Sequence, residues 1–226
     1  MFRKTLLLLF FIVITPSSLA TQKISDGILQ AYWLPIWNDS ATENNPVLHF
    51  RYFSLTENSH IDKIINLDVD TEKKKNNLLK DYFKDIPHNF LTYKEGHIER
   101  MGGIVVENLS ETKECDHIYH NAKLMTFTPG QDRKFNIQKL EESAGCEAYP
   151  YIVTYSAKEG IGSLYFKETP SESAKKSAEI PLDTPLVKIK TINDKWILAA
   201  IYDAEKPDLL GNPQGYIELD KLQPLN

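Results

Sequence analysis

This chain of 226 residues lacks a long hydrophobic run. Its longest apolar stretch has nine residues, from Leu6 to Ile14, whereas a helix that crosses a bilayer needs about 20. Arg3 and Lys4 precede this stretch, and small residues follow it as far as Ala20, which is the pattern of a secretory signal peptide. We therefore expect residues 1–20 to be a signal peptide and the mature chain to be periplasmic or secreted, with no stable membrane anchor.

Cysteine is scarce too, with only Cys115 and Cys146. An even number in an exported chain predicts one disulfide, because the compartments outside the cytoplasm are oxidising. The alternative is a metal site, since Cys115, His117 and His120 form a C-x-H-x-x-H pattern and Cys146 is available as a fourth ligand. The expected export favours the disulfide.

Basic residues are outnumbered. Of the 26 lysines and arginines, Arg3 and Lys4 belong to the expected signal peptide, so 24 remain against 31 acidic residues, a net charge of −7. A basic surface is needed to contact phosphates, so we expect no nucleic-acid partner. A hydrophobic share of 42% is typical of a folded protein.

Catalytic signatures are also missing. No G-x-S-x-G, H-E-x-x-H or phosphate-binding loop accompanies the six histidines. We therefore expect no cofactor, and we favour a binding protein over an enzyme.

The first part of the chain, residues 24–155, is expected to form an α+β domain that is mainly antiparallel β with one or two helices. A helix is predicted where apolar residues from Leu78 to Ile86 fall at helical spacing, with Asp70 or Thr71 as the cap and Pro87 as the end. A shorter helix is predicted over 136–143. The other apolar segments indicate strands, among them 47–55, 61–69, 90–93, 97–101, 104–106, 124–127 and 148–155.

The second part, residues 163–226, follows a polar boundary near Ser156–Gly162 and shows no convincing helix. Its short apolar segments are separated by proline, glycine and asparagine, which is typical of a small barrel.

Four segments of this tail appear in a characteristic order. They are Ser163–Phe166 with the following Thr169–Ser173, then Ile180–Lys188, Asn193–Leu198 and Gly215–Leu222. Together residues 163–225 resemble the bacterial SH3-like (SH3b) family. The resemblance implies an SH3-like β-barrel that recognises cell-wall peptides or other proteins. We recognise no family for residues 24–155.

Four aromatic residues of the tail are candidates for a ligand- or partner-binding patch: Tyr165, Trp196, Tyr202 and Tyr216. The alternative for Trp196 is a place in the core, because large aromatic side chains are usually buried.

Together these features predict a non-enzymatic exported binding protein that docks an envelope protein or a peptidoglycan fragment, such as an inhibitor or immunity-type protein. One alternative is a cell-wall hydrolase, or its accessory, with an SH3-like targeting tail and a catalytic residue such as His117 or His120. The other is a periplasmic protein that binds metal through Cys115, His117, His120 and Cys146.

Overall fold

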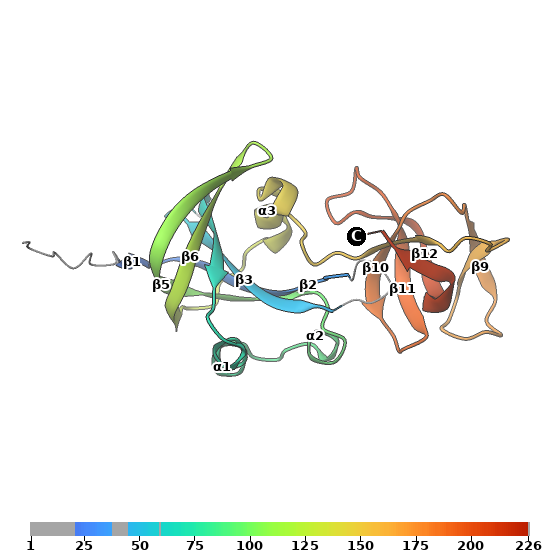
Figure 1. Cartoon of the computed structure of the whole chain (residues 1–226), viewed down its shortest axis with the longest axis horizontal. Helices are drawn as coiled ribbons and strands as arrows, with labels where there is room; N and C mark the ends of the chain where they lie inside the picture. Colours follow the sequence, from blue (N-terminus) through green and yellow to red (C-terminus); the bar gives the residue numbers. More distant parts are fainter. Residues whose placement is uncertain (1–20, 38–44, 59, 226) are drawn as a thin grey trace, which may run out of the picture.

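The computed structural model describes residues 21–37, 45–58 and 60–225, so the expected signal peptide lies outside the described residues. The described residues are mostly strand and form two sheets. The three α-helices among them have only 11, 5 and 6 residues. The expected α+β class is therefore wrong, because these helices are too short to form a layer and instead cover the faces of a sheet (Figure 1). Among the described residues, no helix has the length and hydrophobicity needed to span a bilayer.

The elements of the first sheet and its helices are β1 (Thr21–Ile24), β2 (Gly27–Leu34), β3 (Val47–Leu55), β4 (Ile61–Asp68), α1 (Glu72–Tyr82), α2 (His88–Thr92), β5 (His97–Glu114), β6 (His117–Pro129), α3 (Ile137–Glu142) and the 3-10 turn η1 (Gly145–Glu147). The strand order is β1-β5-β2-β3-β4-β6, and β5 also pairs with β6. These pairings close a ring of five strands, in which only β4 and β6 run parallel.

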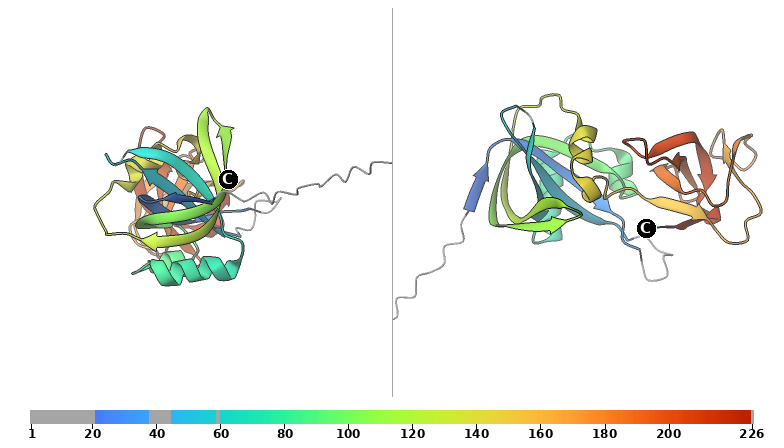
Figure 2. Two further views of the ribbon diagram at one scale, coloured as in Figure 1. Left: turned by 90° about the vertical axis from the view of Figure 1, so that its left-hand side faces the viewer. Right: turned by 90° about the horizontal axis from the view of Figure 1, so that it is seen from above.

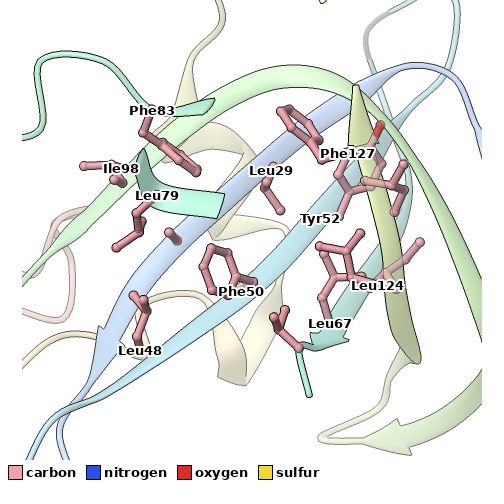
Figure 3. Packing of buried hydrophobic residues seen from close by; sticks show 14 of the residues in the cluster. Leu29, Leu48, Phe50, Tyr52, Leu67, Leu79, Phe83, Ile98, Leu124 and Phe127 are labelled. Atoms are coloured by element: carbon pink, nitrogen blue, oxygen red, sulfur yellow. The ribbon is translucent and has the colours of Figure 1, made fainter. Parts of the chain in front are cut away.

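Both faces of this first sheet are covered. Figure 1 shows α1 and α2 on one side and α3 on the other. The largest core cluster lies on the face covered by α1 and α2, where Leu79 and Phe83 pack near Phe50 (Figure 3). A smaller cluster on the opposite face includes Ile28 and Leu140 of α3. The alternation of side chains along β2 and β3 produces this division, because neighbouring residues on a strand point to opposite faces.

The predicted long helix is confirmed, with a different end. Thr71 is its N-cap, and its hydroxyl accepts a hydrogen bond from Lys74 N at 3.2 Å. The helix ends at Tyr82, before Pro87, which instead precedes α2. The segment 90–93 was expected to be a strand, but its first three residues lie in α2 and Tyr93 is the C-cap, so that prediction is wrong. The second predicted helix is confirmed as α3, capped by Asn136.

The tail contains the strands β7 (Thr154–Ala157), β8 (Leu164–Lys167), β9 (Lys176–Ile180), β10 (Leu186–Thr191), β11 (Trp196–Tyr202), β12 (Leu210–Glu218) and β13 (Leu222–Pro224), with the 3-10 turn η2 (Leu219–Lys221). They form one seven-stranded sheet in the order β13-β7-β10-β11-β12-β8-β9. The expected separate small barrel is thus replaced by a sheet that also includes β7. The strand expected over 148–155, at the end of the first domain, is wrong for 148–153 and begins only at Thr154. β7 pairs with β10 and β13, because Val153 and Tyr155 pack into the second core.

The two sheets lie end to end along the long axis of the molecule (Figure 2). Glu95, just before β5, connects them. Its carboxylate accepts hydrogen bonds from Thr191 N at 2.8 Å and Thr191 Oγ1 at 2.7 Å, and it forms an ion pair with Lys188 Nζ at 2.9 Å. Asn89 adds a hydrogen bond to Glu95 at 2.6 Å and one to Thr191 O at 2.8 Å. Burial alone would raise the pKa of Glu95, but Lys188 and these donors lower it.

Candidate functional site

A cavity of about 600 Å³ lies between the two sheets, beside the Glu95 connection; we call it the intersheet cavity. Residues of both sheets and of α2 and α3 line it, including Phe90, His97, Ile137, Glu141, Tyr149, Tyr151, Ile152, Lys188, Ile189, Lys190, Asp208 and Leu210. A concave site of this size, mainly apolar with a few polar groups and placed between structural units, is the usual setting of a ligand-binding site.

A buried polar cluster lies behind one wall of this cavity, and it consists of Gln30, Arg51, His97, Glu99, Glu141 and Tyr151. The register of the sheet brings three members together, because Gln30 of β2 is paired with Arg51 of β3 on one side and with Glu99 of β5 on the other. Paired residues in adjacent strands share a face. Glu141 approaches the same face from α3.

Arg51 is the centre of this cluster and is fully buried. Its Nε donates to Gln30 Oε1 at 2.6 Å, and its Nη2 lies 3.3 Å from Glu141 Oε1 and donates to Ala148 O at 3.0 Å. Its Nη1 donates to Glu147 O. The guanidinium also lies 4.8 Å from the centre of the Phe53 ring. Arg51 therefore holds α3 and the segment after it against the sheet.

Glu141 is buried, and the protein itself supplies the groups that donate hydrogen bonds to its carboxylate. It accepts from Gln30 Nε2 at 2.7 Å, and the Tyr151 hydroxyl lies 3.0 Å from each carboxylate oxygen. Burial raises the pKa of Glu141, and the charges of His97 and Arg51 and the hydrogen bonds from Gln30 and Tyr151 oppose that shift only in part.

His97 lines the cavity together with Glu141 and Tyr151 of the same cluster. Its Nδ1 contacts the Glu99 carboxylate, and its ring lies 4.2 Å from the Tyr151 ring between centroids. Burial lowers the pKa of His97, but the hydrogen bond to Glu99 and the charges of Glu99 and Glu141 outweigh it, so the pKa is raised. A carboxylate on Nδ1 fixes the orientation of an imidazole and leaves Nε2 for other partners.

The cluster has the residue types of a metal site, because ligand atoms of His97, Glu99 and Glu141 all lie within 4.8 Å of one another. However, Gln30 Nε2 lies 2.7 Å from Glu141, 2.9 Å from Glu99 and 3.3 Å from His97 Nδ1. Arg51 holds the Gln30 oxygen on the other side. A donor nitrogen therefore takes the central position that a cation would need, and the residues do not fit a metal ion in this arrangement.

The metal site that was the alternative to the disulfide is not formed by the described residues either. Cys115 and Cys146 form a disulfide, as predicted, with a Cα–Cα distance of 6.2 Å, and this takes up both thiols. His117 is exposed on β6, whereas His120 is buried with its Nε2 3.4 Å from Glu111. The two histidines are three positions apart on one strand, so they point to opposite faces.

Tyr165, Trp196 and Tyr216 lie on one face of the second sheet, whereas Tyr202 is paired with Leu210 of the cavity lining. Tyr216 is paired with Leu198 and Lys167, which places it on the face of Trp196 and Tyr165. Trp196 is only 4% exposed and Tyr202 is 38% exposed. The Tyr165 hydroxyl donates to Glu179 at 3.2 Å. A partner would thus meet mainly the tyrosines, and their binding role stays a prediction.

The buried polar cluster was missed in the sequence. One signal was available: His97 and Glu99 are two residues apart on a strand and therefore share a face. Arg51 within the apolar segment 47–55 was another. Nothing local connects either with Glu141, which is about 40 positions beyond Glu99 in the chain.

The chain matches no family model, no curated protein and no solved structure. The chemistry of the intersheet cavity is therefore inferred from its own residues.

Proposed function

We propose that this chain is an exported, non-enzymatic binding protein whose intersheet cavity takes a small cell-wall ligand, such as a peptidoglycan fragment. The observation that carries the proposal is the cavity itself, with walls from two sheets, a mostly apolar lining and a few oriented polar groups. A peptide-bearing fragment offers both kinds of surface.

Three further features support a binding role outside the cytoplasm. The disulfide between Cys115 and Cys146 suits an oxidising compartment. The acidic balance of the chain disfavours nucleic acid. The charged members of the buried polar cluster are bound to one another, which is what a rigid wall of a binding site requires.

The test is binding of soluble peptidoglycan fragments to the purified protein, measured by calorimetry. Ile189→Trp should fill the cavity and reduce binding at least about tenfold, since a bulky side chain at a lining position excludes the ligand. Tyr165→Ala, on β8 and outside the cavity lining, is the control and should bind as the parent does. If Tyr165→Ala loses binding and Ile189→Trp keeps it, the aromatic face and not the cavity is the docking site. If no fragment binds, the proposal is wrong.

A second candidate is a cell-wall hydrolase. The observation that favours it is the pair of Glu99 and His97, because a carboxylate on Nδ1 prepares an imidazole for proton transfer through Nε2. Mass spectra of the fragments after incubation would separate the two candidates. New cleavage products that disappear in His97→Gln would support the hydrolase, whereas unchanged fragments support binding alone.

A further inference from the structure

Three rings form one wall of the intersheet cavity. The centroids of His97 and Tyr151 are 4.2 Å apart, and those of Tyr151 and Tyr149 are 6.5 Å apart. The Tyr151 hydroxyl is used by Glu141. A ligand can use only those polar atoms of this wall that do not already have a partner in the protein.

The acceptors behind and beside this wall are occupied by the protein. Glu141 is bound by Gln30, Arg51 and Tyr151, and the Glu95 carboxylate is bound by Thr191, Asn89 and Lys188. Neither carboxylate is therefore free to receive a donor group from a ligand without losing an internal partner.

Two hydrogen-bond donors of the wall, in contrast, are not engaged by the described part of the chain. Within the described ranges, His97 Nε2 has no hydrogen-bond partner, and its side chain keeps 24% of its surface exposed. The Tyr149 hydroxyl is buried and also lacks a partner in the described part of the chain. Burial and the nearby Glu142, Glu141 and Asp208 raise the pKa of Tyr149 to about 12, so its hydroxyl remains a donor at neutral pH.

The charge of His97 depends on groups from every element packed around it. Glu99 of β5 and Glu141 of α3 favour the protonated ring, whereas Arg51 of β3 and burial disfavour it. Gln30 of β2 and Tyr151 contribute no charge at neutral pH. The carboxylates prevail, so His97 presents a charged N–H to the cavity at mildly acidic pH.

We propose that the intersheet cavity selects a ligand that bears a carboxylate, which His97 Nε2–H receives, while the apolar body of the ligand lies against Phe90, Ile152 and Leu210. The inference rests on the proposed binding role of this cavity and specifies its ligand class. Among the other charged residues of the lining, Lys188 is paired with Glu95, and the exposed Lys190 and Asp208 have opposite charges, so the selection depends on His97.

The test uses a matched pair of probes, N-acetylphenylalanine and N-acetylphenylalaninamide, which differ only in the carboxylate. Their dissociation constants are measured by NMR titration from pH 5.5 to 9. At pH 6 the acid should bind about tenfold more tightly than the amide, as expected for a hydrogen bond between charged groups. This preference should disappear as the pH rises through the pKa of His97.

His97→Gln should abolish the preference for the acid and leave binding of the amide within about twofold, because glutamine keeps a polar side chain without the charge. His60→Gln, an exposed histidine before β4 that does not line the cavity, is the matched control and should keep the preference. A folded His97→Gln variant that keeps the preference would overturn the inference.

The remaining outcomes separate this inference from the proposed function. If acid and amide bind equally, or if neither binds while peptidoglycan fragments do, the carboxylate inference is wrong and the binding role stands. If neither the probes nor the fragments bind, both are wrong.

Discussion

At the scale of single residues, the dominant feature is the charge of Arg51 inside the protein. A buried charge is costly to desolvate, and its cost is offset only when each donor has a partner. Here Gln30, Glu141 and two backbone carbonyls supply those partners. The same contacts place His97 and Tyr151 at the cavity wall, so the stability of the cluster and the shape of the proposed site are connected.

Arg51→Met should lower the free energy of unfolding by about 3–5 kcal/mol, because it leaves the buried Glu141 without its cationic partner. Urea denaturation measures this loss. Arg133→Met is the control, since its ion pair with Asp26 is 45% and 41% exposed, and it should cost at most about 1 kcal/mol. Arg51→Met with Glu141→Leu should recover part of the loss. Equal effects of the two arginine variants would contradict a special role for Arg51.

The pair of His97 and Glu99 should make stability depend on pH. The pKa of His97 is raised in the folded protein. The stabilisation is therefore fully present below the unfolded value of about 6.5 and is lost as the pH rises through the folded pKa. Glu99→Gln should remove this dependence in urea titrations between pH 5 and 9, whereas Glu57→Gln on an exposed loop should keep it. If the parent protein becomes more stable above pH 8, the expected direction of the pH dependence is wrong.

At the scale of elements, the ends of the short helices are held by specific contacts. α1 begins at a side-chain cap from Thr71, and α3 begins at one from Asn136. The hairpin of β5 and β6 is linked at its turn to η1 by the disulfide. Gly145 allows this approach, because a Cβ there would overlap the His117 ring and its φ is +58°. Each contact joins a local structure to the sheet.

Thr71→Ala should destabilise the protein by about 1 kcal/mol, because the N–H of Lys74 loses its acceptor at the start of α1. Thermal unfolding followed by circular dichroism measures the effect. Thr71→Ser keeps the hydroxyl and should stay within about 0.5 kcal/mol of the parent. If serine costs as much as alanine, the cap does not stabilise α1.

Replacement of both Cys115 and Cys146 by serine should cost about 2–4 kcal/mol, since the bridge restricts the unfolded chain across a separation of 31 residues. A reducing agent should lower the parent's melting temperature toward that of the double variant. The double variant itself should not respond to the reducing agent. A parent that is insensitive to full reduction would contradict this expectation.

At the scale of the whole molecule, two sheets with separate cores are joined by polar contacts around Glu95 and by Trp37, which packs against the second core. Figure 2 shows how the two parts follow one another along the chain. Because the intersheet cavity lies beside this connection, the relative position of the sheets determines its shape. Contacts far from the cavity wall can therefore alter ligand binding.

Glu95→Gln should weaken the connection between the sheets by about 2 kcal/mol, because hydrogen bonds to a charged acceptor are replaced by weaker ones. Limited proteolysis and small-angle X-ray scattering would detect the loosening. The pKa of Glu95 is lowered in the folded protein, so its contribution is present above about pH 4.3 and lost as the pH falls through the folded value. Glu168→Gln, whose partner Lys175 is exposed, is the control and should change neither measurement.

The sequence alone was enough for features that depend on near neighbours. The spacing of apolar residues identified α1 and most strands, the capping candidates Asp70 and Thr71 marked the start of α1, and two cysteines in an exported chain indicated the disulfide. These signals are local because hydrogen bonds within a helix and the alternation along a strand involve residues only a few positions apart.

Only the tertiary structure decided which distant residues meet. It moved β7 into the second sheet, placed 90–92 in α2, and replaced the expected α+β class by two sheets. It also brought Arg51 to Glu141 and created the cavity beside His97. The physical reason is that strand pairing and the burial of charged groups depend on contacts between segments far apart in the chain. Local sequence patterns carry no information about these contacts.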